Sequence, residues 1–195
     1  MREDRYEIRF SGSGGQGIIT MAVIFAEAAA RYEGKYVCQT QNYGPEARGG
    51  ASKAEVVISS TEIDYPRAIQ LDLLLAMNQT ACDTYFFDFK PNGLLLADAT
   101  LVEQLPTSRV VSIPFTQIAR EAIGKEFVAN MVALGAIGHL CDVVSTRNLE
   151  AVLETRVPPE SKEINRKAFR AGIKAARRID LGLLPQSIVP DEEEV

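Results

Sequence analysis

The chain has 195 residues, of which 46% are hydrophobic and 24% charged, a composition that excludes collagen-like and disordered classes. Its 21 Lys and Arg residues are outnumbered by 26 Asp and Glu residues, and the net charge of −5 argues against a nucleic-acid partner. At this length we expect one domain over residues 1–182 and a tail over 183–195, which ends in the acidic run Asp191–Glu194.

We expect a cytoplasmic protein with no membrane segment and with reduced cysteines. The first ten residues mix both charges, so they do not have the pattern of a secretory signal. The longest apolar stretch, over 127–140, has about 14 residues, whereas a membrane-spanning helix needs about 20. Cys38, Cys82 and Cys141 lie too far apart in the sequence for a zinc or iron–sulfur motif. We interpret all three as packing residues.

The first part of the chain predicts a strand, a glycine-rich turn, a helix and a second strand. Apolar and charged residues alternate over 6–11, which is typical of a strand. Apolar residues then recur with a helical period over 18–32, and Gly34 stands where a C-terminal cap is expected. A short strand over 35–40 completes one βαβ unit, whose crossover should be right-handed.

The remainder alternates short apolar runs with helical stretches. The predicted strands lie over 54–59, 71–77, 94–97 and 110–113. The predicted helices lie over 79–87, 126–140, 146–154 and 161–179, and a Pro-Asn-Gly turn is predicted at 91–93. This alternation indicates an α/β fold with a mostly parallel sheet and C-terminal helices.

Polar segments follow several predicted strands. Ligands of open α/β sheets bind at the carboxyl ends of the strands, so we expect these segments to share one functional edge. The segments are residues 11–17, residues 39–50, Asn78 with Gln79, and Asp98 with Thr100. Asp98 either contacts a ligand there or caps the turn at Thr100.

The first loop matches the pattern G-x-G-x-x-G. It consists of Gly12, Ser13, Gly14, Gly15, Gln16 and Gly17. Glycines let backbone N–H groups approach an anion, and the following helix adds a partial positive charge. An NAD site would need an acidic residue after the second strand, where this chain has Gln39, Thr40 and Gln41. We therefore favour a phosphate- or carboxylate-binding turn, and close strand–helix packing is the alternative explanation of the glycines.

A second glycine-rich loop follows the second strand. It contains Asn42, Tyr43, Gly44, Pro45, Glu46, Arg48, Gly49 and Gly50. Arg48 presents a planar donor fork suited to a carboxylate or a phosphate, and Tyr43 offers a ring with a polar tip. We expect this loop, with Asn78 and Gln79, to bind a ligand or to form an interface; a solvated surface loop is the alternative.

The sequence contains no recognisable catalytic set. We interpret His139, the one histidine, as a satisfied helix residue rather than a general base. No Ser/His/Asp arrangement, Cys/His pair or spaced carboxylate pair is present, so we predict no catalytic residue and no metal site. A basic set near the C-terminus is interpreted as a solvated helix face, with a docking surface for an acidic partner as the alternative. It consists of Arg166, Lys167, Arg170, Lys174, Arg177 and Arg178.

Several of these segments together resemble the gamma subunits of 2-oxoacid:ferredoxin oxidoreductases, most closely the 2-oxoglutarate type. The resemblance covers roughly residues 5–180. The matching segments are Gly12–Gly17, Tyr43–Gly50, Ala54–Ser59, Ile63–Pro66, Asp72–Gln79 and Asn130–Gly135, and near the C-terminus Val157, Pro158, Glu163–Asn165, Ala168, Phe169 and Gly172. The joint occurrence of the two glycine-rich blocks in this order is the specific feature.

The resemblance implies a Rossmann-like domain in a multi-subunit enzyme. Such enzymes oxidatively decarboxylate a 2-oxoacid, transfer the acyl group to coenzyme A and pass the electrons to ferredoxin. Thiamine diphosphate, Mg²⁺ and iron–sulfur clusters are then expected on the alpha, beta and delta-type partner subunits and not on this chain. The isolated chain is expected to be inactive and to form a homodimer.

The resemblance also implies roles for the two loops. Residues Gly12 to Gly17 with Arg48 are expected to contribute to coenzyme A binding or to closure of the acyl-transfer site. Asn42, Tyr43, Gly44, Pro45, Glu46, Gly49 and Gly50 are expected at the interface or near the substrate. Two alternatives are kept open: a subunit of the indolepyruvate type and a self-sufficient NAD-dependent oxidoreductase.

Overall fold

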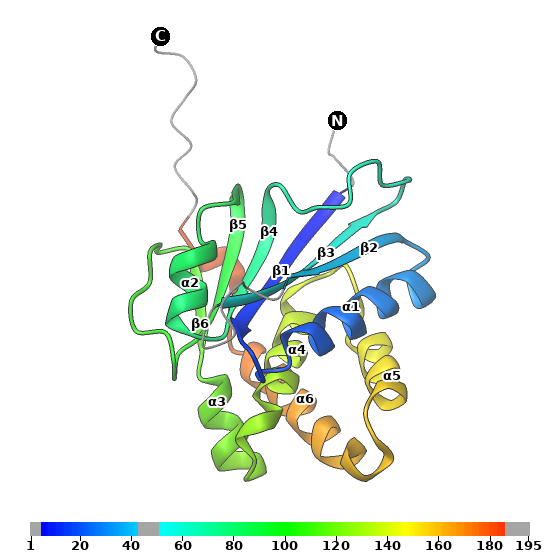
Figure 1. The fold of residues 1–195 in the computed structure, drawn as a ribbon. Coiled ribbons are helices and arrows are strands. Elements are labelled where there is room, and N and C mark those ends of the chain that lie inside the picture. Colours follow the sequence, from blue (N-terminus) through cyan, green and yellow to red (C-terminus); the bar gives the residue numbers. More distant parts are fainter. Residues whose placement is uncertain (1–4, 43–50, 186–195) are drawn as a thin grey trace.

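The fold is built on a six-stranded sheet (Figure 1). The computed structural model describes residues 5–42 and 51–185. The strands are β1 (Arg5–Ser13), β2 (Tyr36–Asn42), β3 (Ala51–Ser59), β4 (Leu71–Ala76), β5 (Phe89–Asp98) and β6 (Val110–Ile113), in the order β2-β3-β1-β4-β5-β6. β1, β4, β5 and β6 are parallel, and β3 runs antiparallel between β2 and β1. The predicted mostly parallel sheet is confirmed, with β3 as its exception.

Helices cover both faces of the sheet unequally. The helices are α1 (Ile18–Tyr32), α2 (Gln79–Tyr85), α3 (Phe115–Ile118), α4 (Ala129–Leu140), α5 (Thr146–Arg156) and α6 (Lys162–Ala176). Shorter turns are η1 (Ala119–Ile123), η2 (Glu126–Val128), η3 (Pro159–Ser161) and η4 (Leu181–Leu183). Alternate residues of β4 and β5 join two apolar clusters: a large one with α1, α4, α5 and α6, and a small one with α2.

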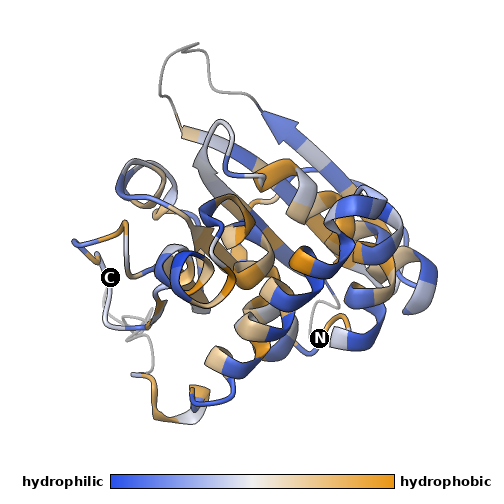
Figure 2. Ribbon diagram, turned by 90° about the horizontal axis from the view of Figure 1, so that it is seen from below, coloured by the Kyte–Doolittle hydropathy of each residue, from blue (hydrophilic) through white to orange (hydrophobic). Residues whose placement is uncertain are grey.

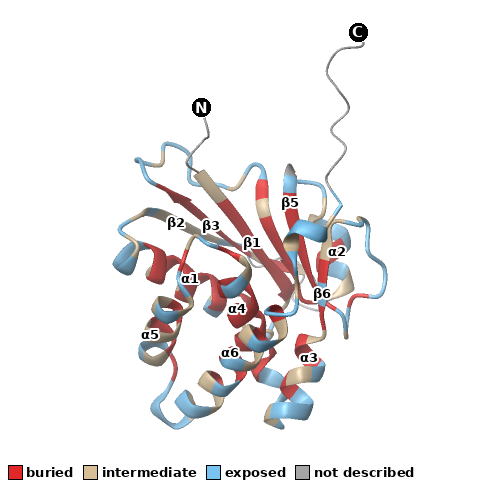
Figure 3. Ribbon diagram, turned by 180° about the vertical axis from the view of Figure 1, so that it is seen from behind, coloured by how far each residue is buried: buried red, intermediate tan, exposed pale blue. Residues whose placement is uncertain are grey.

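Burial follows this layering. Figure 3 shows buried strands and buried inner faces of the helices, with exposed residues on the outer turns. In Figure 2 hydrophobic and hydrophilic segments alternate along the helices, as amphipathic helices require. α4 differs, because every residue from Ala129 to Gly138 is buried, so this helix within the predicted range 126–140 packs on all sides. No helix in the described ranges has the length and apolar character that crossing a bilayer requires.

The alternation predicted for the first strand is confirmed, but its charged side is buried too. Ile8 and Phe10 enter the large cluster. On the other face Arg9 is only 2% exposed, and its guanidinium pairs with Glu55 of β3 at 2.8 Å and with Asp88 at 2.6 Å. The guanidinium also lies 5.6 Å from the centroid of the Tyr85 ring. Paired charges and an aromatic ring thus cover the part of this face that lacks a long helix.

Two local predictions were wrong, and one segment was missed. The expected turn Pro91–Gly93 lies inside β5, next to an irregularity in its pairing with β4 between Leu71 and Leu73. Asn42, expected in a loop, is the last residue of β2, because β2 and β3 extend to pair Asn42 with Lys53. The turns over residues 115–123 were not predicted, since a four-residue helix is too short for a periodic pattern.

Candidate functional site at the carboxyl edge

The carboxyl ends of five strands meet at one edge of the sheet. β2 runs in the same direction as β1, because both are antiparallel to β3, and β4 to β6 are parallel to β1. β3 begins at this edge, where Ala51 pairs with Ser13. The structure therefore brings the first glycine-rich turn, Asn78 and Asp98 to the same side of the sheet, as expected. The glycine-rich turn lies between β1 and the start of α1 (Figure 1).

The turn has the geometry of a tight strand-to-helix connection. Gly12 and Ser13 end β1, and α1 begins at Ile18. Gly15 has φ 89° and Gly17 has φ 70°, a left-handed conformation that favours glycine. Gly17 is the N-cap of α1 and provides no side-chain cap. The N–H groups of Ile18, Ile19 and Thr20 consequently have no acceptor among the described residues.

The glycines of the turn fall into two kinds. A Cβ on Gly12 would lie 2.6 Å from Gln16 Oε1, and one on Gly17 would lie 2.1 Å from Asn130 Nδ2, so these two glycines permit close packing. A Cβ on Gly14 or Gly15 would meet no atom of residues 5–42 or 51–185 within 4 Å. Gly14 also has no positive φ. Packing among the described residues therefore explains Gly12 and Gly17 but gives no reason for a glycine at position 14.

The Gln16 side chain holds the turn against the end of β4. Its Oε1 accepts hydrogen bonds from Ser13 N at 2.7 Å and from Asn78 Nδ2 at 3.2 Å. Its Nε2 donates to the Met77 carbonyl at 3.1 Å. The amide of Gln16 is thus engaged within the protein and positions the backbone around it.

Asn78 and Gln79 also act on their own surroundings. Asn78 Oδ1 accepts from Ala81 N at 2.8 Å and caps α2. Gln79 Oε1 accepts from the N–H groups of Glu103 and Gln104 at 2.9 and 3.0 Å. Both side chains therefore fix loops of the carboxyl edge.

Asp98 is fully buried and has the capping role expected as one alternative. Its Oδ1 accepts from Thr100 N at 3.0 Å, and its Oδ2 accepts from Thr116 N at 3.1 Å and from Thr116 Oγ1 at 2.5 Å. These bonds tie the end of β5 to the start of α3.

A cavity of about 300 Å³ opens beside the turn. Its wall includes Gly15, Met77, Phe127 and Asn130. Phe127 is 65% exposed, and Asn130 is 8% exposed. Neither residue was among the predicted site residues. The available signal was a polar residue, Asn130, within the apolar stretch 127–140.

The second loop, with Tyr43, Gly44, Pro45, Glu46, Arg48, Gly49 and Gly50, lies outside the described residues. Its neighbours Asn42 and Ala51 both belong to the carboxyl edge. The roles of these residues and of Arg48 therefore stay predictions.

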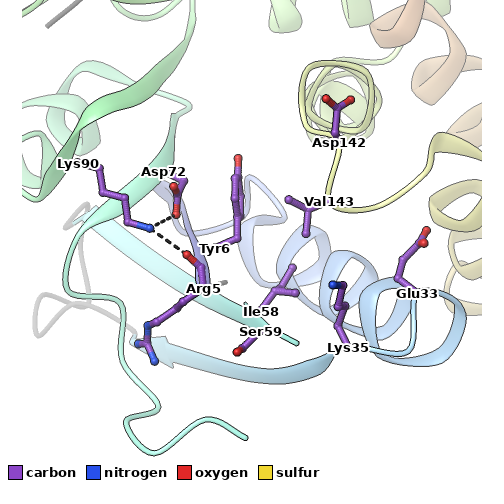
Figure 4. Close-up of a pocket in the computed structure, with 10 residues that line it drawn as sticks. All are labelled: Arg5, Tyr6, Glu33, Lys35, Ile58, Ser59, Asp72, Lys90, Asp142 and Val143. Atoms are coloured by element: carbon purple, nitrogen blue, oxygen red, sulfur yellow. Dashed lines mark hydrogen bonds and ion pairs between the residues drawn. The ribbon is translucent and has the colours of Figure 1, made fainter. Parts of the chain in front are cut away.

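A second cavity, of about 400 Å³, lies at the opposite edge of the sheet (Figure 4). Its charged groups are largely engaged: Lys90 Nζ pairs with Asp72 at 2.8 Å, and Glu33 accepts from Ser145 N at 3.0 Å. Tyr6 Oη lies 2.6 Å from Cys141 Sγ. Burial raises the pKa of Tyr6 well above its usual value and that of the Cys141 thiol to about 12, so both groups are neutral near pH 7.

The remaining titratable candidates are dispersed. His139 is exposed in the last turn of α4, while Cys82 and Cys141 are buried and Cys38 is half-buried. Within the described ranges, no three His, Cys, Asp or Glu side chains are grouped to hold a metal ion. On α6, Arg166, Lys167 and Arg170 pair with glutamates. Lys174 near the end of α6, and Arg177 and Arg178 just after it, are exposed and make no ion pair with described residues.

Residues 7–175 match the family model described as pyruvate ferredoxin/flavodoxin oxidoreductase. The chain belongs to this family. Among its relatives, the 2-oxoglutarate synthase subunit KorC of Methanocaldococcus jannaschii is 47% identical over 179 residues, which are 90% of this chain and 96% of KorC. The resemblance found in the sequence is therefore confirmed over nearly the whole chain.

Solved structures of this oxidoreductase family share the fold. The gamma subunit of a keto/oxoacid ferredoxin oxidoreductase from Geobacter sulfurreducens has a TM-score of 0.82 at 48% identity, covering 89% of this chain and 97% of that one. A 2-oxoglutarate:ferredoxin oxidoreductase from Magnetococcus marinus, solved with 2-oxoglutarate, coenzyme A and succinyl-CoA bound, also has a TM-score of 0.82. It is 26% identical, and the match covers 96% of this chain but 33% of that longer one.

Proposed function

We propose that this chain is the gamma subunit of a 2-oxoglutarate:ferredoxin oxidoreductase. The assembled enzyme converts 2-oxoglutarate and coenzyme A into succinyl-CoA and CO₂ and reduces ferredoxin. The proposal is supported by end-to-end similarity to KorC and to the Geobacter gamma subunit. Thiamine diphosphate, Mg²⁺ and the iron–sulfur clusters belong to the alpha, beta and delta-type subunits in this proposal, and the chain alone is inactive.

In this proposal the chain contributes a glycine rim, residues Gly12–Gly17, against which coenzyme A binds. The observation behind this role concerns Gly14. An added Cβ there would have no neighbour within 4 Å among the described residues, and φ is not positive. A glycine for which the described residues give no reason is explained by a molecule that approaches the backbone from outside. The unsatisfied N–H groups at the start of α1 suit a phosphate group, which coenzyme A carries. Arg48 is expected to supply a further cation.

Affinity purification and reconstitution test the subunit assignment. The tagged full chain is purified from its source organism, and the co-purified proteins are analysed for thiamine diphosphate, iron and 2-oxoglutarate-dependent ferredoxin reduction. We expect thiamine- and cluster-bearing partners and coenzyme A-dependent turnover of 2-oxoglutarate. Turnover of indolepyruvate in its place would contradict the substrate assignment, and oxidation of a 2-oxoacid by the chain alone would contradict the subunit role.

A further inference from the structure

Strand β2 forms one edge of the sheet and carries no charged residue. It spans Tyr36–Asn42 and lies outside β3 in the strand order (Figure 1). Its pairing with β3 runs without a bulge over all seven residues, from Tyr36 opposite Ser59 to Asn42 opposite Lys53. Edge strands that stay unpaired are usually protected by lysine, by proline, by a bulge or by short length. β2 has none of these protections.

The opposite edge of the sheet shows the protection that β2 lacks. β6 has only four residues, Val110–Ile113, and Pro114 follows it. The guanidinium of Arg109, just before β6, donates to the carbonyl groups of Asn92 at 3.3 Å and of Pro185 at 2.9 Å. β6 therefore offers little backbone to a further strand, whereas β2 offers a complete ladder.

The hydrogen-bond register shows which backbone groups of β2 face outward. The Ser11 carbonyl of β1 accepts the Met77 N–H at 3.0 Å, so the backbone groups of Ser11 point toward β4. Because these groups alternate in direction along each strand, Thr40 of β2 exchanges hydrogen bonds with Glu55 of β3. The residues of β2 that point away from the sheet are Val37, Gln39 and Gln41. Their N–H and C=O groups have no hydrogen-bond partner among the described residues.

We infer that the outer edge of β2 pairs with β2 of a second copy of this chain, antiparallel and about a two-fold axis at Gln39. In a two-fold antiparallel pair, one residue must stand opposite its own copy, because opposed side chains lie on the same face. Gln39 is the middle residue of β2 and points outward, so an axis there engages the whole strand. Gln39 then pairs with its copy, and Val37 of each chain pairs with Gln41 of the other. Each of these pairs exchanges two hydrogen bonds.

Charge and side-chain size favour a second copy as the partner. A two-fold axis brings β2 against its own sequence, so a charged residue near the axis would face a like charge. β2 has none, and Lys35, just before it, is hydrogen-bonded to Ser60 at 2.8 Å. Cys38 would stand opposite Thr40, which places two small side chains at the closer, non-hydrogen-bonded pairs. The pairing goes beyond the proposed function and does not depend on it.

Analytical ultracentrifugation of the purified full chain over a concentration series tests the pairing. We expect the wild type to dimerise reversibly. Gln39→Lys places two ammonium groups opposite each other, so it should raise the dimer dissociation constant about tenfold or more. Gln41→Lys is the matched control. Position 41 lies opposite Val37, so the two new lysines stand about 14 Å apart, beyond the Debye length of about 8 Å, and the constant should change less than about threefold.

Mixing two variants separates a contact at the axis from a loss of folding. The side chain of Gln39 makes one hydrogen bond among the described residues, to the Thr40 carbonyl at 3.3 Å, so Gln39→Lys and Gln39→Glu should both fold. Each variant alone should dimerise weakly, because like charges meet at the axis. An equimolar mixture should form a heterodimer at least as tight as the wild-type dimer, because opposite charges then face each other. A mixture that dimerises no better than the separate variants overturns an axis at Gln39.

Disulfide trapping locates the axis in the same full chain. Under oxidation Gln39→Cys should give a dimer bridged between the two copies of position 39, because opposed hydrogen-bonded residues have Cα atoms about 5.5 Å apart. Gln41→Cys, on the same edge and more exposed, should remain largely monomeric under oxidation and denaturation. Equal cross-linking at both positions, or a dimer that Gln39→Lys leaves unchanged, overturns the inference. A wild type that stays monomeric at high concentration also overturns it and leaves the edge to a strand of another subunit.

Discussion

Gly135 on α4 lies directly against the carbonyl of Phe169 on α6: a Cβ on Gly135 would be 1.9 Å from that oxygen. The contact is reciprocal, since a Cβ on Gly172 of α6 would be 1.8 Å from the Val132 carbonyl of α4. The two helices thus touch through their backbones. This contact fixes α4, whose second residue, Asn130, lies beside the glycine-rich turn.

We expect Gly135→Ala to destabilise the fold by about 2 kcal/mol, because overpacking outweighs the gain in helix propensity. Urea unfolding of the full chain measures this change. Gly138→Ala is the control, because its Cβ would meet the flexible end of the Leu149 side chain at 2.5 Å instead of a carbonyl. Equal stabilities of Gly135→Ala and the wild type would contradict the backbone contact.

The buried pair Arg9–Glu55 supplies a second prediction. Both side chains are nearly inaccessible, and Arg9→Met would leave the Glu55 carboxylate with Lys53 alone. We expect Arg9→Met to cost about 3–5 kcal/mol of unfolding free energy and the double variant Arg9→Met/Glu55→Leu to cost less. Arg120→Ala, which breaks an exposed pair, should change stability by less than about 1 kcal/mol. A cost for Arg9→Met as small as that for Arg120→Ala would refute a stabilising buried pair.

Acid should destabilise the protein through Glu33. The backbone N–H of Ser145 and the side chain of Asn148 lower the pKa of Glu33 from its ordinary value of 4.5. Because the folded state binds this proton less tightly than the unfolded state, the stabilisation is complete above pH 4.5 and is lost as the pH falls through the lowered pKa. Unfolding free energies at pH 7 and at a pH well below 4.5 should differ less for Glu33→Gln than for the wild type. An unchanged difference would count against this role of Glu33.

Thiol reactivity should distinguish the three cysteines. Burial raises the pKa of Cys141 to about 12 and also raises that of Cys82, so neither forms much thiolate near pH 8. Cys38 lies half-buried on β2, at the edge of the sheet. We expect iodoacetamide to modify Cys38 in the native protein and all three residues in urea, as read by mass spectrometry. Rapid native alkylation of Cys141 would show that its surroundings are open.

Local patterns in the sequence predict much of the fold. Alternation in β1, the apolar run of β4 and the all-round apolar character of α4 each reflect a face that must be buried. The reversed direction of β3 was not predicted, because pairing order depends on contacts between distant segments. The wrong turn at Pro91–Gly93 has a similar cause: pairing with β4 accommodates those residues in an irregular strand.

The sequence predicted where the candidate site lies but not the role of each residue in it. The glycine pattern predicted the turn, and positive φ at Gly17 confirms its conformation. Gln16 and Asn78 serve mainly as internal positioning groups, a role that depends on the Met77 carbonyl and the start of α2. Asn130 lies next to Gly17 only through packing of α4, and no local sequence signal links positions so far apart.

The central claim, that the glycine rim of this chain helps to bind coenzyme A, is tested most directly by the coenzyme A KM of the assembled enzyme carrying Gly14→Val. A Cβ at position 14 meets no atom of the described residues within 4 Å, so the variant should fold, and Gly182→Val provides a control at a distant glycine without positive φ. We predict a KM for coenzyme A raised about tenfold or more in Gly14→Val and in Arg48→Ala, with the coenzyme A-independent oxidation of 2-oxoglutarate unchanged. A KM equal to that of the wild type and of Gly182→Val would contradict the claim.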